Sequence, residues 1–313
     1  MKIVFVGTGA FAVPTLEALA QSRHSILAVV TQPDRPAGRG QELTPSPVKE
    51  AALKFHLRIY QPERINAEHS VAQLRYLQPD VLLVCSYGQI VSKDVLEVPK
   101  VAALNVHGSL LPRHRGASPV QAAILHRDRE TGVTVIWMDE GIDTGDILLA
   151  EKAMVRSTDT AQTLGERLSR MAPRVLLKAL ELLEEGKAPR IPQDPKLATY
   201  APRLTKEDGR IDWSRPKEET EAQIRAMIPW PGAYTFVPDR EGKKMLKIFR
   251  VIISLRARGK PGEVCRVDEH GILVAAGEKG GLLLREVQLE GKKRMAAKDF
   301  AHGFPIAPGM ILG

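Results

Sequence analysis

The sequence predicts an α/β protein, with a doubly wound, mostly parallel β-sheet followed by a small antiparallel β-barrel. Over the first half of the chain, short apolar runs rich in β-branched residues alternate with helical patterns, as in sheets covered on both faces. After a proline-rich segment, short strand-like pieces are separated by glycine and charged turns, as in a small barrel. The 313 residues, 43% apolar and 26% charged, are enough for two globular domains.

The expected strands of the sheet are the runs at residues 2–7, 26–31, 80–85, 101–107 and 131–138, with helical patterns such as FAVPTLEALAQS and SPVKEAALKFH between them. A long amphipathic helix is expected from about residue 160 to 185, with Gly186 as its C-cap. The next segment has four prolines and no sustained period. We therefore expect a first domain over residues 1–187, an extended linker over 188–208 and a second domain over 209–313.

The cysteines and the net charge limit the classes of function that are possible. The two cysteines, Cys85 and Cys265, cannot form a disulfide framework, so a reducing cytoplasm is expected. The start MKIVFVGTGAF predicts a strand rather than a signal peptide, and no apolar run reaches the about 18 residues of a membrane span. The net charge is +8, and residues 205–313 carry 20 lysines and arginines against 15 aspartates and glutamates. This balance favours an anionic partner such as nucleic acid, with plain solubility as the alternative.

Two loops near the amino end could contact anions. The turn GTGAFA (7–12) is close to the dinucleotide fingerprint G-x-G-x-x-G/A, although a tight strand-to-helix turn is the alternative. Asp34 is followed directly by Arg35 near the end of the second strand, which weighs against a nicotinamide-dependent oxidoreductase. Residues 32–49 form a long Pro/Gly-rich loop with Arg35 and Arg39, either a mobile loop that touches an anionic partner or a solvent loop.

The stretch LNVHG ends a central strand with two polar side chains. Asn105 and His107 alternate along the strand, so they share one side at the carboxyl end, where open α/β sheets bind ligands. Their N–H groups could hold the oxyanion of an attacked carbonyl, whereas a structural histidine is the alternative. The loop MDEGIDTGDIL (138–148) offers carboxylates that could orient His107 or act as a general base. Its spacing differs from a calcium-binding EF-hand, no Cys/His cluster suggests zinc, and we expect no metal.

NVHGSLLPRHRGASPVQAAI together with DEGIDTGDIL resembles the signature of the folate-dependent formyltransferases. Four other stretches resemble, within this family, the members that formylate methionyl-tRNA: KIVFVGTGAFAVPTLEAL, TQPDRPAGRGQELTPSPVK, ATYAPRLTKEDGRIDW and PWPGAYT. The resemblance covers nearly the whole chain. It implies a Rossmann-like formyltransferase domain, an OB-like second domain, 10-formyltetrahydrofolate as donor and initiator methionyl-tRNA as acceptor. We further expect a monomer.

The resemblance also implies site residues. Asn105, His107 and Asp143 would be the catalytic trio. The folate donor would be lined by Ser109, Leu110, Leu111 and Pro112, and by the backbone around Tyr87, Gln89, Ile90 and the 139–142 loop. The tRNA would meet Arg39, Arg35, Arg203, Lys206, Lys243, Lys244, Lys247, Lys292, Lys293 and Arg294.

One departure from the family pattern lies after GRG, where the family often has two basic residues and this chain has Gln41 and Glu42. Loop attraction to phosphate would then be weaker, and Arg39 would carry more of it. Two further alternatives stay open: a formyltransferase for a small amine acceptor, such as an amino sugar nucleotide, and a nucleic-acid-binding protein without chemistry.

Overall fold

The computed structural model describes residues 1–37, 42–239 and 242–313, and these form two compact units. The first unit consists of Met1–Pro119, Glu130–Met154 and Gly165–Pro202. The second consists of Val120–Arg129, Val155–Leu164 and Arg203–Gly313. Each unit is thus made of three separate segments, whereas the sequence predicted two continuous domains joined by a linker. The boundaries at residues 187 and 209 stay a prediction.

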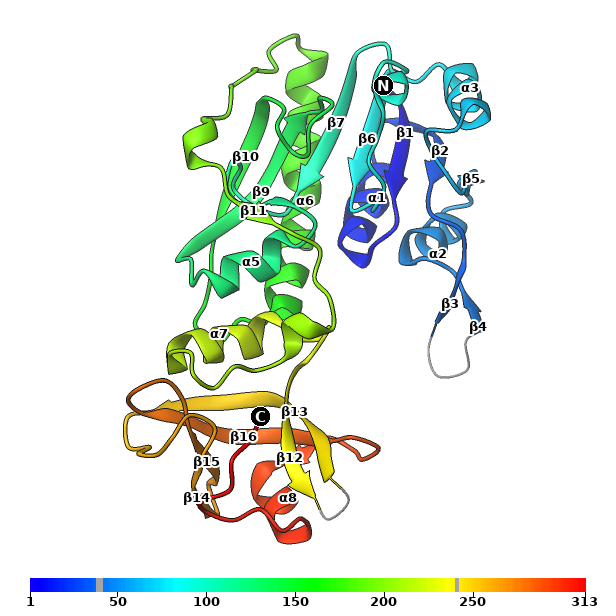
Figure 1. Cartoon of the computed structure of the whole chain (residues 1–313). Helices are drawn as coiled ribbons and strands as arrows, with labels where there is room; N and C mark the ends of the chain where they lie inside the picture. The colour runs from blue at the N-terminus through cyan, green and yellow to red at the C-terminus, as the bar shows by residue number, and fades with distance from the viewer. Residues whose placement is uncertain (38–41, 240–241) are drawn as a thin grey trace. The chain divides into compact units, whose positions relative to one another are not determined.

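The first unit is built on a seven-stranded sheet with the order β10-β9-β7-β6-β1-β2-β5 (Figure 1). Its strands are β1 (Lys2–Gly7), β2 (Ser25–Val30), β5 (Ile59–Tyr60), β6 (Val81–Cys85), β7 (Ala102–His107), β9 (Glu130–Trp137) and β10 (Ile147–Met154). The five strands from β7 to β5 are parallel, whereas β9 and β10 are antiparallel additions at one edge. The expected mostly parallel α/β sheet is therefore confirmed.

The buried strands explain why the sequence showed continuous apolar runs. Every residue of β6 and five of the six residues of β1 are buried. Neither strand has a face exposed to solvent, so polar and apolar residues do not alternate along it. The helices of this part of the chain are α1 (Val13–Ala20), α2 (Pro47–Lys54), α3 (Glu68–Leu77), α4 (Lys93–Leu96), α5 (Pro119–Leu125) and α6 (Ala161–Glu184), with a 3-10 turn η1 (Ala10–Ala12). Within the described ranges, none of the helices has the length and apolar character of a membrane span.

Because β9 runs antiparallel to β7, the loop at 138–146 starts beside the beginning of β7 and not beside its carboxyl end. The backbone N–H of Met138 donates to the carbonyl of Ala103 at 2.8 Å, near the start of β7 rather than at its end. The base of the loop is closed by Trp137, whose N–H donates to the carbonyl of Asp146 at 2.9 Å. From this base the loop extends back towards the last residues of β7.

The segment expected as a linker is tied to the first unit at several points. The indole N–H of Trp137 donates to the carbonyl of Pro189 at 2.8 Å, and the guanidinium of Arg190 lies 3.8 Å from the Trp137 ring centre. Ile191 pairs with Ile147, beside β10. Further on, past the 3-10 turn η2 (Pro195–Leu197), β11 (Tyr200–Ala201) pairs in parallel with β8 (Arg115–Gly116). We call residues 189–201 the strap.

The second unit contains a six-stranded antiparallel sheet, the yellow-to-red part of Figure 1. Its strands are β12 (Ala233–Asp239), β13 (Gly242–Ser254), β14 (Val264–Asp268), β15 (Gly271–Ala275), β16 (Gly281–Leu289) and β17 (Met295–Ala296), preceded by η3 (Glu207–Gly209) and α7 (Lys217–Ala226) and followed by α8 (Ala297–Gly303). The hydrogen-bonded path ends at β12 and β14. Residues 309–313 join these two strands, because Val264 N–H donates to Met310 O at 2.8 Å and Gly313 N–H donates to Phe236 O at 3.0 Å.

Gly145 is required where the 138–146 loop closes. A Cβ atom at this position would lie 1.7 Å from the carbonyl oxygen of Trp137. We expect Gly145→Ala to displace the base of the loop and cost about 1–3 kcal/mol, as overpacking typically does. Thermal unfolding of the purified protein should show Tm lowered by several degrees, whereas Gly303→Ala, which meets no atom within 4 Å, should leave Tm unchanged. Equal Tm values for the two variants would contradict this account.

Candidate active site

The end of β7 presents two polar side chains on one side of the sheet. Asn105 is half-buried and His107 is 6% exposed, while Val106 between them packs into the core on the other side. The strand pairs with β6 and β9 on its two edges, so the positions of both side chains are fixed by neighbouring backbone. Asn105 and His107 therefore lie on the same side of β7, as the sequence predicted.

Asp143 joins these two side chains. Its Oδ1 accepts a hydrogen bond from Asn105 Nδ2 at 2.9 Å, and its Oδ2 lies 3.4 Å from His107 Nδ1. The backbone N–H of Gly116 also donates to Oδ2, at 2.8 Å. Asp143 has a left-handed backbone conformation, with φ of 55°, which directs its side chain back from the loop towards β7. The structure thus brings the three expected catalytic residues together.

The other acids of the loop take different positions. Asp139 Oδ1 accepts hydrogen bonds from Gly141 N–H at 3.1 Å and from the Thr144 hydroxyl at 2.6 Å, so this carboxylate shapes the turn. Glu140 lies 3.9 Å from Lys93 Nζ at the start of α4. Asp143 is therefore the acid of this loop whose carboxylate contacts the polar pair of β7.

Both ring nitrogens of His107 face an oxygen atom of the protein. Nε2 lies 2.9 Å from the carbonyl oxygen of His114, which can only accept, so Nε2 carries a proton. Nδ1 faces a carboxylate oxygen of Asp143. The 3.4 Å separation is longer than the about 2.7–3.2 Å of a full N–H···O hydrogen bond. A proton on Nδ1 would be only weakly engaged by Asp143 and could also reach a negative oxygen, as could the second amide proton of Asn105.

Residues outside the expected set support this cluster. The carbonyl of His114 and the N–H of Gly116, which contact His107 and Asp143, belong to the turn into β8 and to β8 itself. Gln193, in the strap, donates from Nε2 to the carbonyl oxygens of Asp143 at 2.9 Å and Gly145 at 2.7 Å. Sequence reasoning missed these contacts because the strap has no period, and backbone groups leave no residue-type signal.

The expected folate residues fall into two groups. In the turn after β7, Leu111 is 6% exposed and Ser109 is fully buried, with its hydroxyl donating to Arg113 O at 2.6 Å. Leu110 and Pro112 are half-buried. Ser109 therefore shapes the turn, and the partly open Leu110 and Pro112 are the better candidates for contact with a ligand.

The segment after β6 offers mainly backbone and one apolar side chain. Tyr87 is 3% exposed in the core, and burial raises the pKa of its phenol to about 12. The amide of Gln89 bridges Ile65 N–H and Glu63 O, at 3.1 and 3.0 Å. By contrast, Ile90 is 68% exposed, and Ile142 in the facing loop is 54% exposed. These two apolar side chains could border a flat ring.

The glycine turn 7–12 is not an open anion site. The N–H groups of Thr8 and Gly9 donate to the carbonyl of Ser86 at 3.1 and 3.0 Å. A Cβ on Gly9 would lie 2.5 Å from the Ser86 hydroxyl oxygen, so this glycine serves close packing between two loops. The dinucleotide-binding alternative loses support, because the amides of Thr8 and Gly9 are already occupied by the protein.

The basic residues expected to contact tRNA are partly grouped. In the second unit, Lys243 donates to Gly313 O at 2.8 Å and Lys244 pairs with Asp239, near the start of β13. The turn with the exposed Lys292 and Lys293 follows Glu290, whose N–H donates to Met245 O at 2.9 Å, so it lies beside the same end of β13. Lys247 is half-buried on this strand, whereas Lys206 and Arg203 are exposed before η3.

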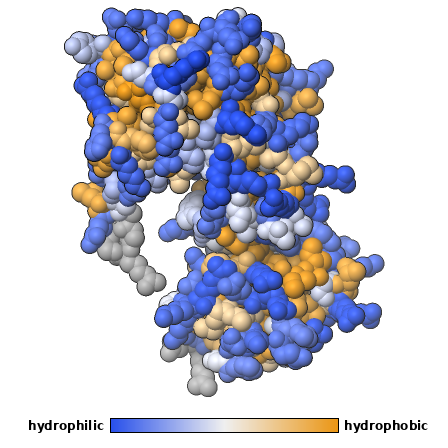
Figure 2. Space-filling model, turned by 180° about the vertical axis from the view of Figure 1, so that it is seen from behind, coloured by the Kyte–Doolittle hydropathy of each residue, from blue (hydrophilic) through white to orange (hydrophobic). Residues whose placement is uncertain are grey.

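The remaining members of that set are less available. Arg294 pairs with Glu286 at 2.6 Å and stacks 4.2 Å from the Phe249 ring centre, and Arg35 lies 3.5 Å from Glu63. Arg39 and Gln41 lie outside the described residues. At its other end, β13 leads into exposed apolar side chains, Ile252, Ile253 and Leu255, and Figure 2 shows apolar areas on this unit. Of the expected set, Lys243, Lys244, Lys292 and Lys293 therefore lie near the start of β13.

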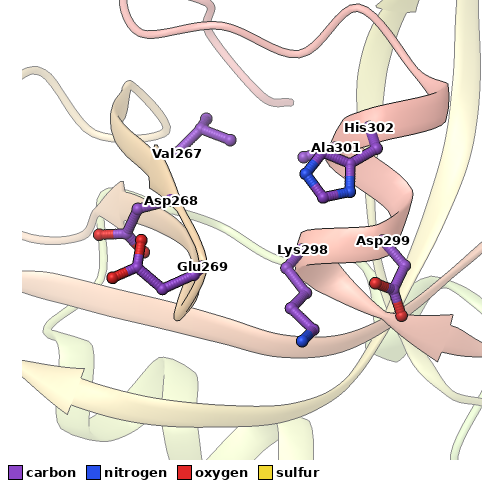
Figure 3. A pocket seen from close by; sticks show the side chains of 7 residues that line it. All are labelled: Val267, Asp268, Glu269, Lys298, Asp299, Ala301 and His302. Atoms are coloured by element: carbon purple, nitrogen blue, oxygen red, sulfur yellow. The ribbon is translucent and has the colours of Figure 1, made fainter.

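A hollow between β14 and α8 carries no comparable site (Figure 3). The carboxylates of Asp268 and Glu269 point away from α8, and that of Asp299 points away from β14. Asp268 is engaged locally, by Arg266 at 2.7 Å and by His270 N–H at 2.8 Å. In the described part of the chain, no group of three His, Cys, Asp or Glu side chains is placed to hold a metal ion.

Comparison with known proteins places the chain in a family. Residues 1–180 match the formyl transferase family model, and residues 203–305 match that of the formyl transferase C-terminal domain. HypX from Aquifex aeolicus, solved with tetrahydrofolic acid, shares the fold with a TM-score of 0.62 at 18% identity, over 96% of this chain and 46% of that one. The N-formyltransferase from Helicobacter canadensis, solved with folinic acid and dTDP-3-aminofucose, gives a TM-score of 0.63 at 19% identity, over 91% and 98% of the two chains.

A sequence relative shows to which of the formyltransferases with this fold the chain is related. The methionyl-tRNA formyltransferase of Methylacidiphilum infernorum is 60% identical over 314 aligned residues, which cover 100% of this chain and 98% of that protein. This identity extends through both units and the strap between their family-model matches. The chain therefore belongs to the methionyl-tRNA formyltransferase family and is a formyltransferase enzyme.

Proposed function

We propose that this enzyme transfers the formyl group of 10-formyltetrahydrofolate to the α-amino group of initiator methionyl-tRNA in the cytoplasm, acting as a monomer. The observation that carries the proposal is the cluster of Asn105, His107 and Asp143 within a chain of this family. Asp143 contacts both other side chains, so donors for a negative oxygen and a proton acceptor lie together.

The amine must be neutral to attack the formyl carbon. A free α-amine has a pKa of about 7.7–8.0, and the neighbouring ester carbonyl of an aminoacyl-tRNA makes its deprotonation easier. A strong base is therefore unnecessary, and placement of the two substrates contributes more. The amine nitrogen forms the new C–N bond, and the bond from the formyl carbon to N10 then breaks. One proton leaves the amine and one is gained by N10, so the reaction needs no other reactant.

Oxyanion stabilisation would come from two directions. The second amide proton of Asn105 would be the direct donor, because its first is held by Asp143. His107 would be the second group facing the oxyanion, with Nε2 kept in place by the carbonyl of His114. Asp143 would orient His107 and take or relay the amine proton, directly or through a water molecule.

The donor would lie along the carboxyl side of β6 and β7. The exposed Ile90 and Ile142 would border the pterin ring, and Leu110 and Pro112 would form the wall after β7. The contact between Lys93 and Glu140 at 3.9 Å supports this placement, since it brings the start of α4 next to the 138–146 loop.

The alternative acceptor is a small amine, such as an amino sugar nucleotide, because the first unit by itself does not discriminate between acceptors. The lysines near the start of β13 favour the tRNA, since a polyanion can engage several cations at once whereas a small acceptor carries only one or two phosphates. We expect purified protein with 10-formyltetrahydrofolate to formylate methionyl-tRNA but not glycinamide ribonucleotide or a dTDP-amino sugar, as measured by label transfer. Preferential formylation of either small amine would refute the proposal.

Substitutions in the trio should separate chemistry from binding. Losing one oxyanion donor typically lowers turnover by about 10²–10³-fold, so Asn105→Ala should do so while donor affinity changes little. Asp143→Asn should lower turnover at least as much, because it removes the charge beside His107. Steady-state kinetics would measure both effects, with Asp212→Asn, in an exposed turn of the second unit, as the matched carboxylate control. Near-wild-type turnover in both trio variants would show that the trio is wrong.

Affinity for tRNA should depend strongly on salt. Each phosphate neutralised by Lys or Arg contributes about −0.7 to −0.9 to the slope of log K against log salt concentration. We expect Lys243→Ala combined with Lys247→Ala to make that slope about 1.4–1.8 units shallower in binding titrations. The pair Lys178→Ala and Lys187→Ala, on and just after α6, should leave it unchanged. A slope near zero for the wild-type protein would count against the tRNA interface.

A further inference from the structure

We infer that Gln193, held by Arg115, is a positioning residue that sets the place of Asp143; this inference rests on the proposed role of Asp143 in formyl transfer. Gln193 lies in the strap, between α6 and β11. It touches none of the reacting groups itself. Its contribution would pass through the backbone of the residue whose carboxylate joins Asn105 and His107.

The contacts of Gln193 leave one orientation for its side-chain amide. Oε1 accepts from Arg115 Nε at 3.1 Å and Nη2 at 2.8 Å. Nε2 donates to the carbonyl oxygens of Asp143 at 2.9 Å and Gly145 at 2.7 Å. Rotating the amide by half a turn would place N–H groups against the guanidinium and an oxygen against two carbonyls. The buried Arg115, 6% exposed, therefore fixes which end of Gln193 faces the loop.

The loop needs such a contact because of its backbone conformation. Asp143 is left-handed, with φ of 55°, a conformation that a residue with a Cβ rarely adopts unless its surroundings hold it there. One amide group binds the carbonyls on both sides of Thr144 and so fixes the direction of the loop over two peptide units. The carboxylate of Asp143 is thereby presented to β7 from a fixed backbone.

The rest of the strap acts on the opposite side of the same cluster. The hydroxyl of Thr199 accepts from His114 N–H at 2.9 Å, and its carbonyl accepts from Arg115 N–H at 2.9 Å. His114 in turn supplies the carbonyl that contacts His107, and Gly116 supplies the N–H that contacts Asp143. Both partners of the Asp143–His107 pair are therefore positioned by one continuous segment, which supports a role in orientation beyond general stability.

The test uses Gln193→Met, which keeps the length and volume of the side chain but removes its hydrogen bonds. We expect kcat to fall by about 10–100-fold, since misplacement by about 1 Å can cost about 10²-fold. The KM values for 10-formyltetrahydrofolate and methionyl-tRNA should stay within about threefold. Arg115→Lys, which keeps the charge but not the two-donor contact, should give a smaller fall in kcat and serves as a second variant if Gln193→Met does not fold.

The second unit offers a matched control. Gln223 Nε2 also donates to two carbonyl oxygens, those of Asp208 at 2.8 Å and Arg210 at 2.9 Å. Gln223→Met should lower Tm about as much as Gln193→Met but leave kcat within about twofold of wild type. If both variants lowered Tm and kcat in parallel, Gln193 would be merely structural and the inference overturned.

Asp143→Asn distinguishes failure of this inference from failure of the proposed function. If Asp143→Asn loses turnover but Gln193→Met and Arg115→Lys keep wild-type kcat, the positioning role is refuted and the trio stands. If Asp143→Asn itself keeps wild-type turnover, the proposed mechanism falls, and the role of Gln193 falls with it.

Discussion

The site depends on the carboxylate of Asp143. It is mostly withdrawn from water, at 12% exposure, and it faces donors from β7 and β8. A charge withdrawn from water without such partners would cost several kcal/mol, so the carboxylate and its partners require one another. The 138–146 loop, the end of β7 and the turn into β8 thus meet at a single side chain. Other features of the first unit can be understood by how they bring these three segments to that point.

Such an arrangement suits a reaction limited by placement. In the proposed transfer, the formyl carbon would meet an amine that is already nucleophilic, so the protein would gain most from donors that need no rearrangement when charge develops. His107 has little freedom to turn, because its Nε2 is held by a backbone carbonyl and its Nδ1 faces a carboxylate. Asn105 is fixed in the same way by the first of its two amide protons. The entropy cost of ordering these two side chains is therefore incurred when the protein folds, and not when the transition state forms.

The sequence predicted those features that leave a local pattern. Buried parallel strands produce continuous apolar runs, and strand parity places Asn105 and His107 on one side. Four acids in the next loop could not be ranked by their types; resemblance singled out Asp143, and the structure supplies the reason in its left-handed backbone. The antiparallel direction of β9 leaves no mark in its composition, so the starting point of the loop was not predictable. The occupied amides of Thr8 and Gly9 were equally hidden, because a glycine turn looks the same with or without an internal acceptor.

The strap changes where the first unit should be considered to end. Judged by regular secondary structure, it is finished at Glu184, where α6 stops, and residues 1–184 contain all three side chains of the trio. That portion would nevertheless lack Gln193, Thr199 and β11, which fix the loop and the turn around the trio. A protein cut between α6 and the strap would possess the three proposed catalytic residues without the contacts that position them. The smallest portion that contains the proposed site together with these contacts therefore extends to Ala201, across a stretch that composition alone would assign to a linker.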